Sequence, residues 1–337
     1  MTFNILWPGM RWDDARQIEI DSVADGGKAV LYDAEAEVPD DSYRQADAIV
    51  SVVDIPEHRR PLLERCRIFV TPKVGFDNID IEAWGALGIP VSNIPDYGTQ
   101  EVADHALALM LSLVRCIPMH HRRLAADPVA NWVPRHNPLA RRLSRSVCGI
   151  VGLGRIGTAL ALRAKTLGMD VVFYDPYKPN GSDLALNVRR AESLAELFAQ
   201  SDVVSIHVPL EDGTRNLIDA EVLAHAKQDL ILINSARGPI VDIDALHDAM
   251  KSGRVGAAGL DVLPEEPPNL DRPLVRAWAD REEWLLDRLL ITPHSAFSTP
   301  ESVHDMRSKP AEVALKYLKT GQLDNCVNQQ FLVGPAH

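Results

Sequence analysis

Short apolar runs alternate with stretches of helical periodicity along almost the whole chain. The strand-like runs of the first part are Asn4–Trp7, Ala29–Tyr32, Ala48–Val53, Ile68–Val70 and Pro90–Ser92, with a helical segment at Ile81–Leu87. The alternation then restarts with Val147–Val151, Val171–Tyr174, Val203–His207, Leu230–Asn234, Ala257–Val262 and Leu289–Thr292. Strands that alternate with helices at this spacing predict parallel sheets wound on both faces. The two series therefore predict an α/β fold with two doubly wound parallel-sheet domains.

Two helical patterns lie outside this alternation. Residues 102–123 carry apolar side chains at helical spacing and lead into a polar, Pro-bearing stretch at 127–145, so they predict one long helix between the sheets. Such a helix fits a hinge and a dimer surface, and it fits a plain connecting helix equally well. Residues 300–320 form another helical run near the end of the chain. We expect that helix to return to the first domain.

Composition narrows the class of protein. The 337 residues are 46% hydrophobic and 24% charged, enough for two globular domains with separate cores. A formal net charge of −12 argues against non-specific binding to nucleic acid or to anionic membranes, which requires a basic surface. No apolar stretch approaches the ~18 residues of a membrane span. We expect neither a nucleic-acid partner nor a membrane partner.

The cysteines and the N-terminus bear on the compartment. Cys66, Cys116, Cys148 and Cys326 are widely scattered and form no CxxC pair, which favours reduced thiols over disulfides or a metal site. The first ten residues lack the basic and apolar regions of a signal peptide. These features predict a cytoplasmic protein without a bound metal.

The most informative local motif is GLGRIG at residues 152–157. Glycines fall at this spacing by chance, but here an apolar strand precedes the motif and an Ala/Leu-rich helix follows it. Gly152 permits the tight turn, Gly154 lets the backbone approach a pyrophosphate, and Gly157 lets helix and strand pack closely. The first N–H groups of the helix would meet the phosphates. The motif predicts a dinucleotide site.

Asp175 ends the next apolar strand, 18 residues after Gly157. An acid at this place meets the adenosine ribose hydroxyls and repels the 2′-phosphate of NADP. The alternative is a surface Asp at a strand end, followed by Pro176 in a turn. The full strand–helix–strand context favours the first interpretation, so NAD is the expected cofactor.

Three polar groups at or beyond the ends of late strands are candidates for the chemistry, because ligands bind at these ends of open parallel sheets. Arg237 offers a planar two-pronged donor suited to a carboxylate. His294 is a suitable proton carrier near neutrality. A carboxylate of the pair Glu265 and Glu266 would fix the tautomer of His294. Taken singly, each has an ordinary explanation as a surface, loop or solvated residue.

The order of these motifs is characteristic. The glycine motif and Asp175 are followed by HVPL at 207–210, NSARG at 234–238, GLDV at 259–262, EEP at 265–267 and TPH at 292–294. The earlier stretches KVGFDNIDIEAWGALGIPVSN at 73–93 and TQEVADHALALML at 99–111 precede them. Together they resemble the D-isomer-specific 2-hydroxyacid dehydrogenase family over most of the chain. The resemblance implies two Rossmann-like domains with a cleft between them, usually in a homodimer.

The resemblance also implies a role for each matching residue. Arg237 would bind the substrate carboxylate and polarise its carbonyl, with His294 as general acid/base and Glu266 as the acidic partner of that histidine. Backbone N–H groups of Val74 and Gly75 would meet the substrate carboxylate from the other domain. The cofactor would be held by Gly152, Gly154, Arg155, Ile156, Gly157, Asp175, His207, Pro209, Ser235, Ala236 and Asp261, the last at the nicotinamide carboxamide.

The implied domains are a flavodoxin-like substrate domain, 1–100 plus 296–337, and an NAD-binding Rossmann domain, 101–295. The implied activity is hydride transfer between NAD(H) and a small 2-hydroxy acid, of the D configuration that the family name gives, and its 2-oxo partner. One departure is Phe297, because many relatives carry small residues after the TPH histidine. A bulky aromatic there resembles the branch of C-terminal-binding proteins, which carry a tryptophan at the equivalent place. Phe297 is either an apolar wall of the substrate site or a packing residue of its own domain.

Two alternatives stay open at this point. C-terminal-binding proteins act as NAD(H)-sensing scaffolds, so the chain is alternatively a corepressor-like binding protein with residual activity. Related dehydrogenases that act on formate or phosphite share the Arg, Glu and His set. The presence of all three catalytic candidates argues against the interpretation as a scaffold.

Overall fold

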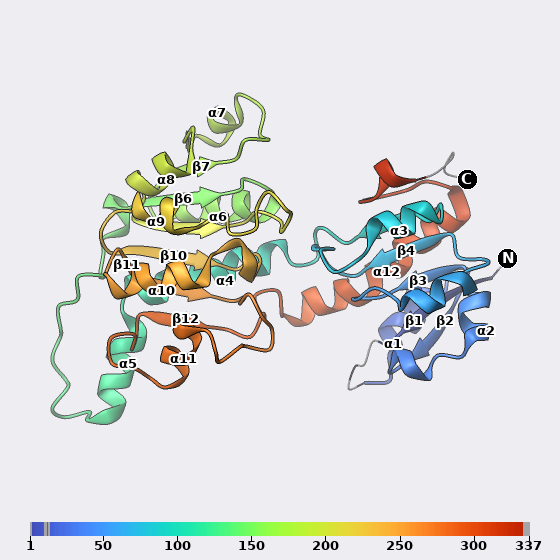
Figure 1. The fold of residues 1–337 in the computed structure, drawn as a ribbon, viewed down its shortest axis with the longest axis horizontal. Coiled ribbons are helices and arrows are strands. Elements are labelled where there is room, and N and C mark those ends of the chain that lie inside the picture. Colours follow the sequence, from blue (N-terminus) through green and yellow to red (C-terminus); the bar gives the residue numbers. More distant parts are fainter. Residues whose placement is uncertain (1, 10–11, 13, 333–337) are drawn as a thin grey trace. The chain divides into compact units, whose positions relative to one another are not determined.

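The computed structural model describes residues 2–9, 12 and 14–332. The chain divides into two compact units, which we describe separately (Figure 1). Unit 1 comprises Met1–Gly98 and Ser298–His337, and unit 2 comprises Thr99–Phe297. Unit 2 is therefore continuous in the chain, whereas unit 1 is built from two separate segments.

Unit 1 contains a five-stranded parallel sheet in the order β2-β1-β3-β4-β5. Its strands are β1 (Phe3–Pro8), β2 (Gly27–Tyr32), β3 (Ala48–Val50), β4 (Ile68–Thr71) and β5 (Val91–Asn93). Its helices are α1 (Gln17–Ser22), α2 (Asp40–Gln45), α3 (Ile81–Ala86) and α12 (Pro300–Thr320). The central strands are covered on both faces, which explains their uninterrupted apolar sequences.

The two faces of this sheet belong to two apolar layers. Successive side chains of a strand point to opposite faces. On β3, Val50 therefore joins the layer with α12, while Ile49 joins the layer with Trp84 of α3. The layer with α12 includes Ala311, Ala314, Leu315, Tyr317 and Leu318 of that helix. The C-terminal helix thus completes the core of the N-terminal sheet.

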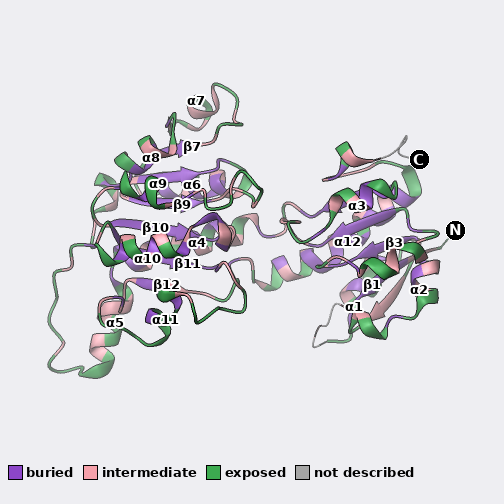
Figure 2. Cartoon of the chain, in the orientation of Figure 1, coloured by how far each residue is buried: buried purple, intermediate pink, exposed green. Residues whose placement is uncertain are grey.

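Unit 2 contains a seven-stranded parallel sheet in the order β12-β11-β10-β9-β6-β7-β8. Its strands are β6 (Val147–Val151), β7 (Asp170–Tyr174), β8 (Arg189–Arg190), β9 (Val203–Ile206), β10 (Leu230–Asn234), β11 (Val255–Leu260) and β12 (Leu289–Ile291). Its helices are α4 (Thr99–Val114), α5 (Ile117–Ala126), α6 (Arg155–Thr166), α7 (Ser182–Leu186), α8 (Leu194–Gln200), α9 (Ala220–Ala224), α10 (Ile243–Lys251) and α11 (Pro273–Ala279). Figure 2 shows the strands buried between helices whose outer faces are exposed.

The predicted fold class of two parallel-sheet α/β units is confirmed. The short strand β8 and helix α11, which lies in the long approach to β12, were not predicted. Short 3₁₀ turns complete the structure at Glu35–Glu37, Glu57–Leu62, Leu143–Arg145, Gly238–Ile240 and Gln329–Phe331.

The prediction of one long helix over residues 102–123 is wrong. The structure has α4 and α5 instead, with a bend of 59° between them. Cys116 adopts a left-handed backbone conformation with φ of 53°, and Pro118 lies in the first turn of α5. Proline has no N–H to donate to the preceding turn, so it begins a new helix rather than continuing an old one.

The hydropathy of the helices agrees with this break. Among residues 2–9, 12 and 14–332, no single helix has both the length and the apolar character of a membrane span. In the same residues, α4 and α5 have that length and apolar character only when the two helices are taken together across their bend. Most apolar residues of α4 pack in the core of unit 2, where they include Ala106, Leu109 and Leu113.

Candidate active site

The strand order of unit 2 places a ligand site by topology. From β6 the chain proceeds outward to β7 and β8, and then returns to β9 on the other side of β6. Open parallel sheets bind ligands at the carboxyl ends of strands where the order reverses in this way. The glycine motif follows β6, and His207 follows β9, so both lie at this reversal.

The glycine loop has the shape of a phosphate cradle. A Cβ atom on Gly157 would lie 2.0 Å from Gly152 O, so only glycine permits helix α6 to approach the strand this closely. A Cβ on Gly154 would meet nothing within 4 Å, so the backbone faces open space there. Gly154 N-caps α6 without a side-chain hydrogen bond, and the exposed Arg155 and half-buried Ile156 begin the helix. Open space above uncapped N–H groups fits a pyrophosphate.

Asp175 lies directly after β7 and faces this loop. Its Oδ2 accepts a hydrogen bond of 2.9 Å from the N–H of Leu153, and its Oδ1 accepts one of 3.0 Å from the N–H of Tyr177. The side chain is half-buried, and each carboxylate oxygen can accept more than one hydrogen bond. Asp175 is therefore fixed beside the glycine loop as a negatively charged group that can still accept further hydrogen bonds.

His207 and Pro209 follow β9 on the opposite side of the glycine loop. A Cβ on Gly152 would lie 2.8 Å from His207 O, so the two loops are in direct contact. The imidazole Nε2 is 2.9 Å from Ser205 Oγ. Burial lowers the pKa of His207 to about 4, so the ring is neutral at pH 7. His207 therefore offers packing and hydrogen bonding rather than charge, next to the exposed Pro209.

The turn after β10 carries Ser235, Ala236 and Arg237. Asn234 braces this turn: its side chain accepts from the N–H of Ala236 at 3.0 Å and donates to Arg237 O at 2.9 Å. The Ser235 hydroxyl is buried and has no hydrogen-bond partner among the described residues. A buried hydroxyl of this kind costs free energy, and a polar group of a bound cofactor would satisfy it.

Close backbone contact brings Arg237 to the acidic segment after β11. A Cβ on Gly238 would lie 1.9 Å from the carbonyl carbon of Leu263, so any side chain there would force the two segments apart. The charge of Arg237 acts on Glu266, whose pKa it helps to lower. Arg237 is half-buried, and its Nη1 donates to Ala236 O at 2.7 Å.

Glu266 and His294 form a direct pair. His294 Nδ1 lies 2.7 Å from Glu266 Oε2, and the N–H of Leu263 donates to Glu266 Oε1 at 3.1 Å. Burial alone raises the pKa of Glu266, but these hydrogen bonds and the charges of His294 and Arg237 outweigh burial and leave that pKa below its ordinary value. The carboxylate therefore holds the proton on Nδ1, which leaves Nε2 to exchange a proton with a ligand. The other member of the acidic pair, Glu265, faces Arg272 instead.

The backbone of His294 is held in an uncommon conformation. Its φ is 51°, in the left-handed region, and its N–H donates to Asp261 O at 2.8 Å. Asp261 is 1% exposed, and its carboxylate accepts from the N–H groups of Ser295 and Ala296, each at 2.9 Å. Asp261 thus binds the backbone of the turn that carries His294. Non-glycine residues in this region occur mainly where surrounding contacts enforce them, and such residues cluster at functional sites.

Two residues outside the predicted site also contact this turn. Thr292 Oγ1 lies 2.6 Å from Asp261 Oδ1, and His105 Nε2 lies 2.9 Å from Thr292 Oγ1. Thr292 belongs to the TPH motif and His105 to the TQEVADHALALML stretch, so both were visible in sequence. Nothing in the local pattern indicated that they meet.

The remaining predicted residues lie elsewhere. Val74 and Gly75 lie in unit 1, in the loop after β4, where Val74 O accepts a hydrogen bond of 2.7 Å from Asn93. Phe297 is the last residue of unit 2 and is half-buried. The structure thus brings Arg237, Glu266 and His294 together within unit 2.

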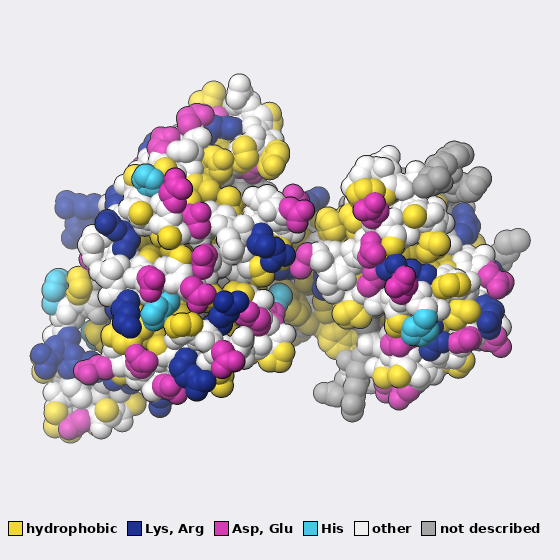
Figure 3. Space-filling model, viewed as in Figure 1, with side chains coloured by type: hydrophobic (Ala, Val, Ile, Leu, Met, Phe, Trp, Pro, Cys, Tyr) yellow, Lys and Arg dark blue, Asp and Glu magenta, His cyan; other side chains and the backbone are white. Residues whose placement is uncertain are grey.

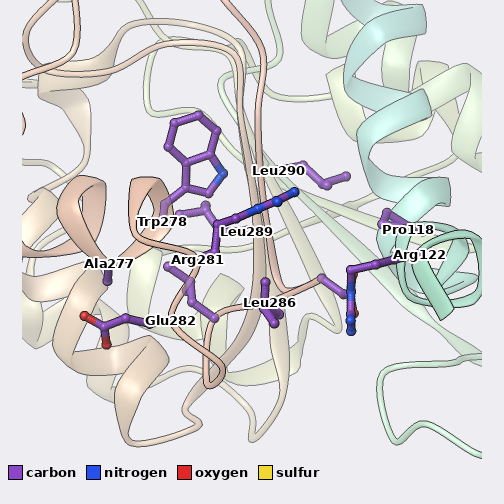
Figure 4. Close-up of a pocket in the computed structure, with 11 residues that line it drawn as sticks. Pro118, Arg122, Ala277, Trp278, Arg281, Glu282, Leu286, Leu289 and Leu290 are labelled. Carbon is purple, nitrogen blue, oxygen red and sulfur yellow. The ribbon is translucent and has the colours of Figure 1, made fainter. Parts of the chain in front are cut away.

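A separate surface pocket of about 190 Å³ lies between α5, α11 and β12. Figure 4 shows Trp278 and Arg122 on opposite sides of it. Arg122 also forms an ion pair of 2.5 Å with Asp287. None of the predicted site residues lines this pocket, so it is distinct from the candidate site.

A dinucleotide cradle beside an Arg, Glu and His cluster, all at the carboxyl ends of parallel strands, defines an NAD-dependent oxidoreductase. Residues 107–296 match the family model described as D-isomer specific 2-hydroxyacid dehydrogenase, NAD binding domain. The chain belongs to the D-isomer-specific 2-hydroxyacid dehydrogenase family.

Two relatives and one solved structure are similar to this chain over most of its length. The chain is 36% identical over 265 residues to a D-3-phosphoglycerate dehydrogenase of Methanocaldococcus jannaschii, covering 79% of this chain and 48% of that protein, about half its length. It is 34% identical over 296 residues to a glyoxylate reductase of Korarchaeum cryptofilum, covering 85% and 84%. Its fold is similar to the crystal structure of D-lactate dehydrogenase from Aquifex aeolicus with NAD and lactic acid, with a TM-score of 0.79, 30% identity, and 96% and 99% coverage.

Proposed function

We propose that this protein reversibly reduces a small 2-oxo acid to the D-2-hydroxy acid with NADH. The observation that carries the proposal is the hydrogen-bonded pair of His294 and Glu266, together with the nearby charge of Arg237, which helps to lower the pKa of Glu266. Bound NADH would supply the hydride, and NAD would accept it in the opposite direction. The rest of the chemistry is a proton transfer and the binding of a carboxylate, for which this chain has the necessary groups.

His294 would move the proton. With Nδ1 bonded to Glu266, the imidazole can donate a proton from Nε2 to the carbonyl oxygen during reduction, or accept the hydroxyl proton during oxidation. The ionised Glu266 stabilises the cationic form of the ring and fixes its orientation. Arg237 would bind the substrate carboxylate through two parallel hydrogen bonds.

The binding of NAD would fall to unit 2 and the remaining substrate contacts to unit 1. The glycine loop, Asp175 and the turn at Ser235 and Ala236 fit the phosphates, the ribose and the nicotinamide end. We propose that backbone N–H groups of Val74 and Gly75 contact the substrate carboxylate. Unit 1 would then be the substrate domain.

The direct test is NADH oxidation, followed by absorbance, with glyoxylate, hydroxypyruvate, pyruvate and phenylpyruvate. We expect turnover on at least one of these acids. Glyoxylate gives the achiral glycolate, so the configuration is read from the other three acids, whose product should be the D isomer on chiral chromatography. Tight NADH binding without turnover on any acid would contradict the proposal. That result would favour the NAD(H)-sensing scaffold.

Replacing Asp175 with Asn should narrow the preference for NAD over NADP. Asn keeps an acceptor oxygen for only one of the N–H groups of Leu153 and Tyr177, which bond to different oxygens of Asp175, but it removes the charge that repels a 2′-phosphate. Like-charge contacts cost several kcal/mol, so we expect the ratio of kcat/KM values for NAD and NADP to fall about tenfold or more. Asp175→Glu, which retains the charge, is the control. An unchanged ratio in Asp175→Asn would place the selectivity elsewhere.

Phe297 would form an apolar wall that favours substrates with a hydrophobic side chain. Phe297→Ala should then lower the ratio of kcat/KM for phenylpyruvate to that for pyruvate by about tenfold, the usual scale for lost apolar contact in a pocket. Phe297→Leu keeps an apolar side chain and should change the ratio less. If both variants retain the wild-type ratio, Phe297 is a packing residue.

We also propose that the protein is a cytoplasmic homodimer. Val129, Trp132 and Val133 follow α5 and are 87%, 77% and 57% exposed, respectively, and apolar groups of this size gathered on one segment favour association. All four cysteines are free thiols, which suits a reducing compartment. On the face shown in Figure 3, acidic and basic side chains are interspersed. Light scattering that gives the mass of one chain would contradict the dimer.

A further inference from the structure

Three side chains form a continuous hydrogen-bonded link in unit 2: His105, Thr292 and Asp261. His105 Nε2 is 2.9 Å from Thr292 Oγ1, and Thr292 Oγ1 is 2.6 Å from Asp261 Oδ1. An ionised carboxylate only accepts, so the single hydroxyl proton of Thr292 points to Asp261. The oxygen of Thr292 must then accept from His105. The geometry therefore places a proton on His105 Nε2.

The link ends on the turn that carries the proposed proton carrier. Asp261 Oδ1 accepts from the N–H of Ser295, and Oδ2 accepts from the N–H of Ala296. The backbone of His294, with φ of 51°, bonds to the carbonyl of Asp261 itself. Because Asp261 is 1% exposed, each donor that it loses leaves a buried charge less compensated.

Packing of α4 sets the position of His105. Leu109 lies one turn after His105 on the same helix face, and a Cβ on Gly259 would lie 3.0 Å from its Cβ. Glycine in β11 thus lets α4 approach the sheet closely at this place. One turn earlier, the imidazole of His105 reaches the residues that follow β11 and β12. Its Nε2 also lies 3.6 Å from Asp261 Oδ1.

We propose that His105 is a positioning residue of this enzyme. By donating its Nε2 proton to Thr292, His105 holds the Thr292 hydroxyl in place against Asp261 and so helps to keep the His294 turn in its left-handed conformation. The inference rests on the proposed role of His294 as proton carrier. It differs from that role because His105 acts through two other side chains and touches neither His294 nor Glu266 in the hydrogen bonds of the described structure.

Two matched pairs of variants test this link. His105→Phe removes the donor but keeps a ring, whereas His105→Gln keeps an N–H donor. Thr292→Val removes the hydroxyl at nearly constant volume, whereas Thr292→Ser keeps it. For each protein, hydrogen–deuterium exchange of residues 292–297 is measured without ligands, and kcat and the KM for NADH are measured with a 2-oxo acid. Exchange of β6 serves as the remote control.

His105→Phe and Thr292→Val should accelerate exchange at Ser295 and Ala296 and lower kcat roughly 10- to 100-fold, the scale of a misplaced catalytic group. Exchange of β6 and the KM for NADH should not change, and His105→Gln and Thr292→Ser should restore most of kcat. Unchanged exchange at Ser295 and Ala296 in His105→Phe overturns the inference. Faster exchange in β6 as well would show a merely structural role and also overturn it. Absence of turnover in the wild type would instead contradict the proposed function, and exchange alone would then decide whether the link holds the turn.

Discussion

Replacing His294 with Asn should lower kcat/KM for reduction of a 2-oxo acid about 10²- to 10⁴-fold, the usual contribution of a positioned proton donor. Asn is the informative choice because it tolerates a left-handed backbone, which His294 adopts with φ of 51°. Its amide can also donate to Glu266 in place of Nδ1–H. The substitution therefore removes the proton at Nε2 while disturbing the turn little.

The pH profile and a binding measurement complete this test. The residual activity of His294→Asn should lose the limb of the profile that depends on a proton carrier, whereas the Kd for NADH should stay as in the wild type. Glu266 keeps its charge through neutral pH, because its folded-state pKa lies below the ordinary value. The stability that this ionisation contributes is present above the unfolded-state pKa and disappears only as pH falls through the folded-state pKa. Wild-type activity in His294→Asn would exclude His294 as the proton carrier.

Replacing Arg237 with Lys should lower kcat/KM about 10²-fold or more, although the charge is conserved. A guanidinium can bind both oxygens of a carboxylate in one plane, whereas an ammonium acts as a point charge. The turn that presents Arg237 is braced by Asn234 and packed against Leu263, so the substitution leaves its backbone in place. Steady-state kinetics at saturating NADH measure the loss.

Arg237→Gln removes the charge as well as the two-pronged hydrogen-bond donor, so its comparison with Arg237→Lys separates the two effects. It should lose activity like Arg237→Lys, but it should also raise the pKa of Glu266, because the charge of Arg237 helps to lower that pKa. NMR titration of the Glu266 carboxyl measures this second effect. Near-normal kcat/KM in Arg237→Lys would exclude bidentate binding of the substrate by this residue.

The strand positions and the fold class could be predicted because local patterns determine them. Val147–Val151 and Leu230–Asn234, for example, begin and end at the residues that their apolar sequences indicate. The order of the motifs along the sequence likewise indicates the family. The break between α4 and α5 was missed because apolar spacing continues across it, although Pro118 was a local signal.

Contacts between distant segments were harder to predict. Glu265 and Glu266 are adjacent and chemically alike, and only the folded turn shows that Glu266 faces His294 while Glu265 faces Arg272. The contact of His105 with Thr292 spans 187 residues and depends on how closely α4 packs on β11, where Gly259 admits Leu109. Periodicity indicates which face of a helix is buried, but not which residue of another strand it meets.

The division of unit 1 into two chain segments determines when its core can form during synthesis. The strands β1, β3 and β4 receive α12 on one face, and α12 begins at Pro300. Unit 2 lies in the sequence between the two segments of unit 1, so all of it must be synthesised before α12. At typical elongation rates this delays α12 by roughly 10–40 s. During that interval the face of β3 and β4 that α12 covers, with Val50 and Val70, has no helix to bury it. We therefore expect nascent chains of this protein to expose an apolar face suited to chaperone binding until α12 is made.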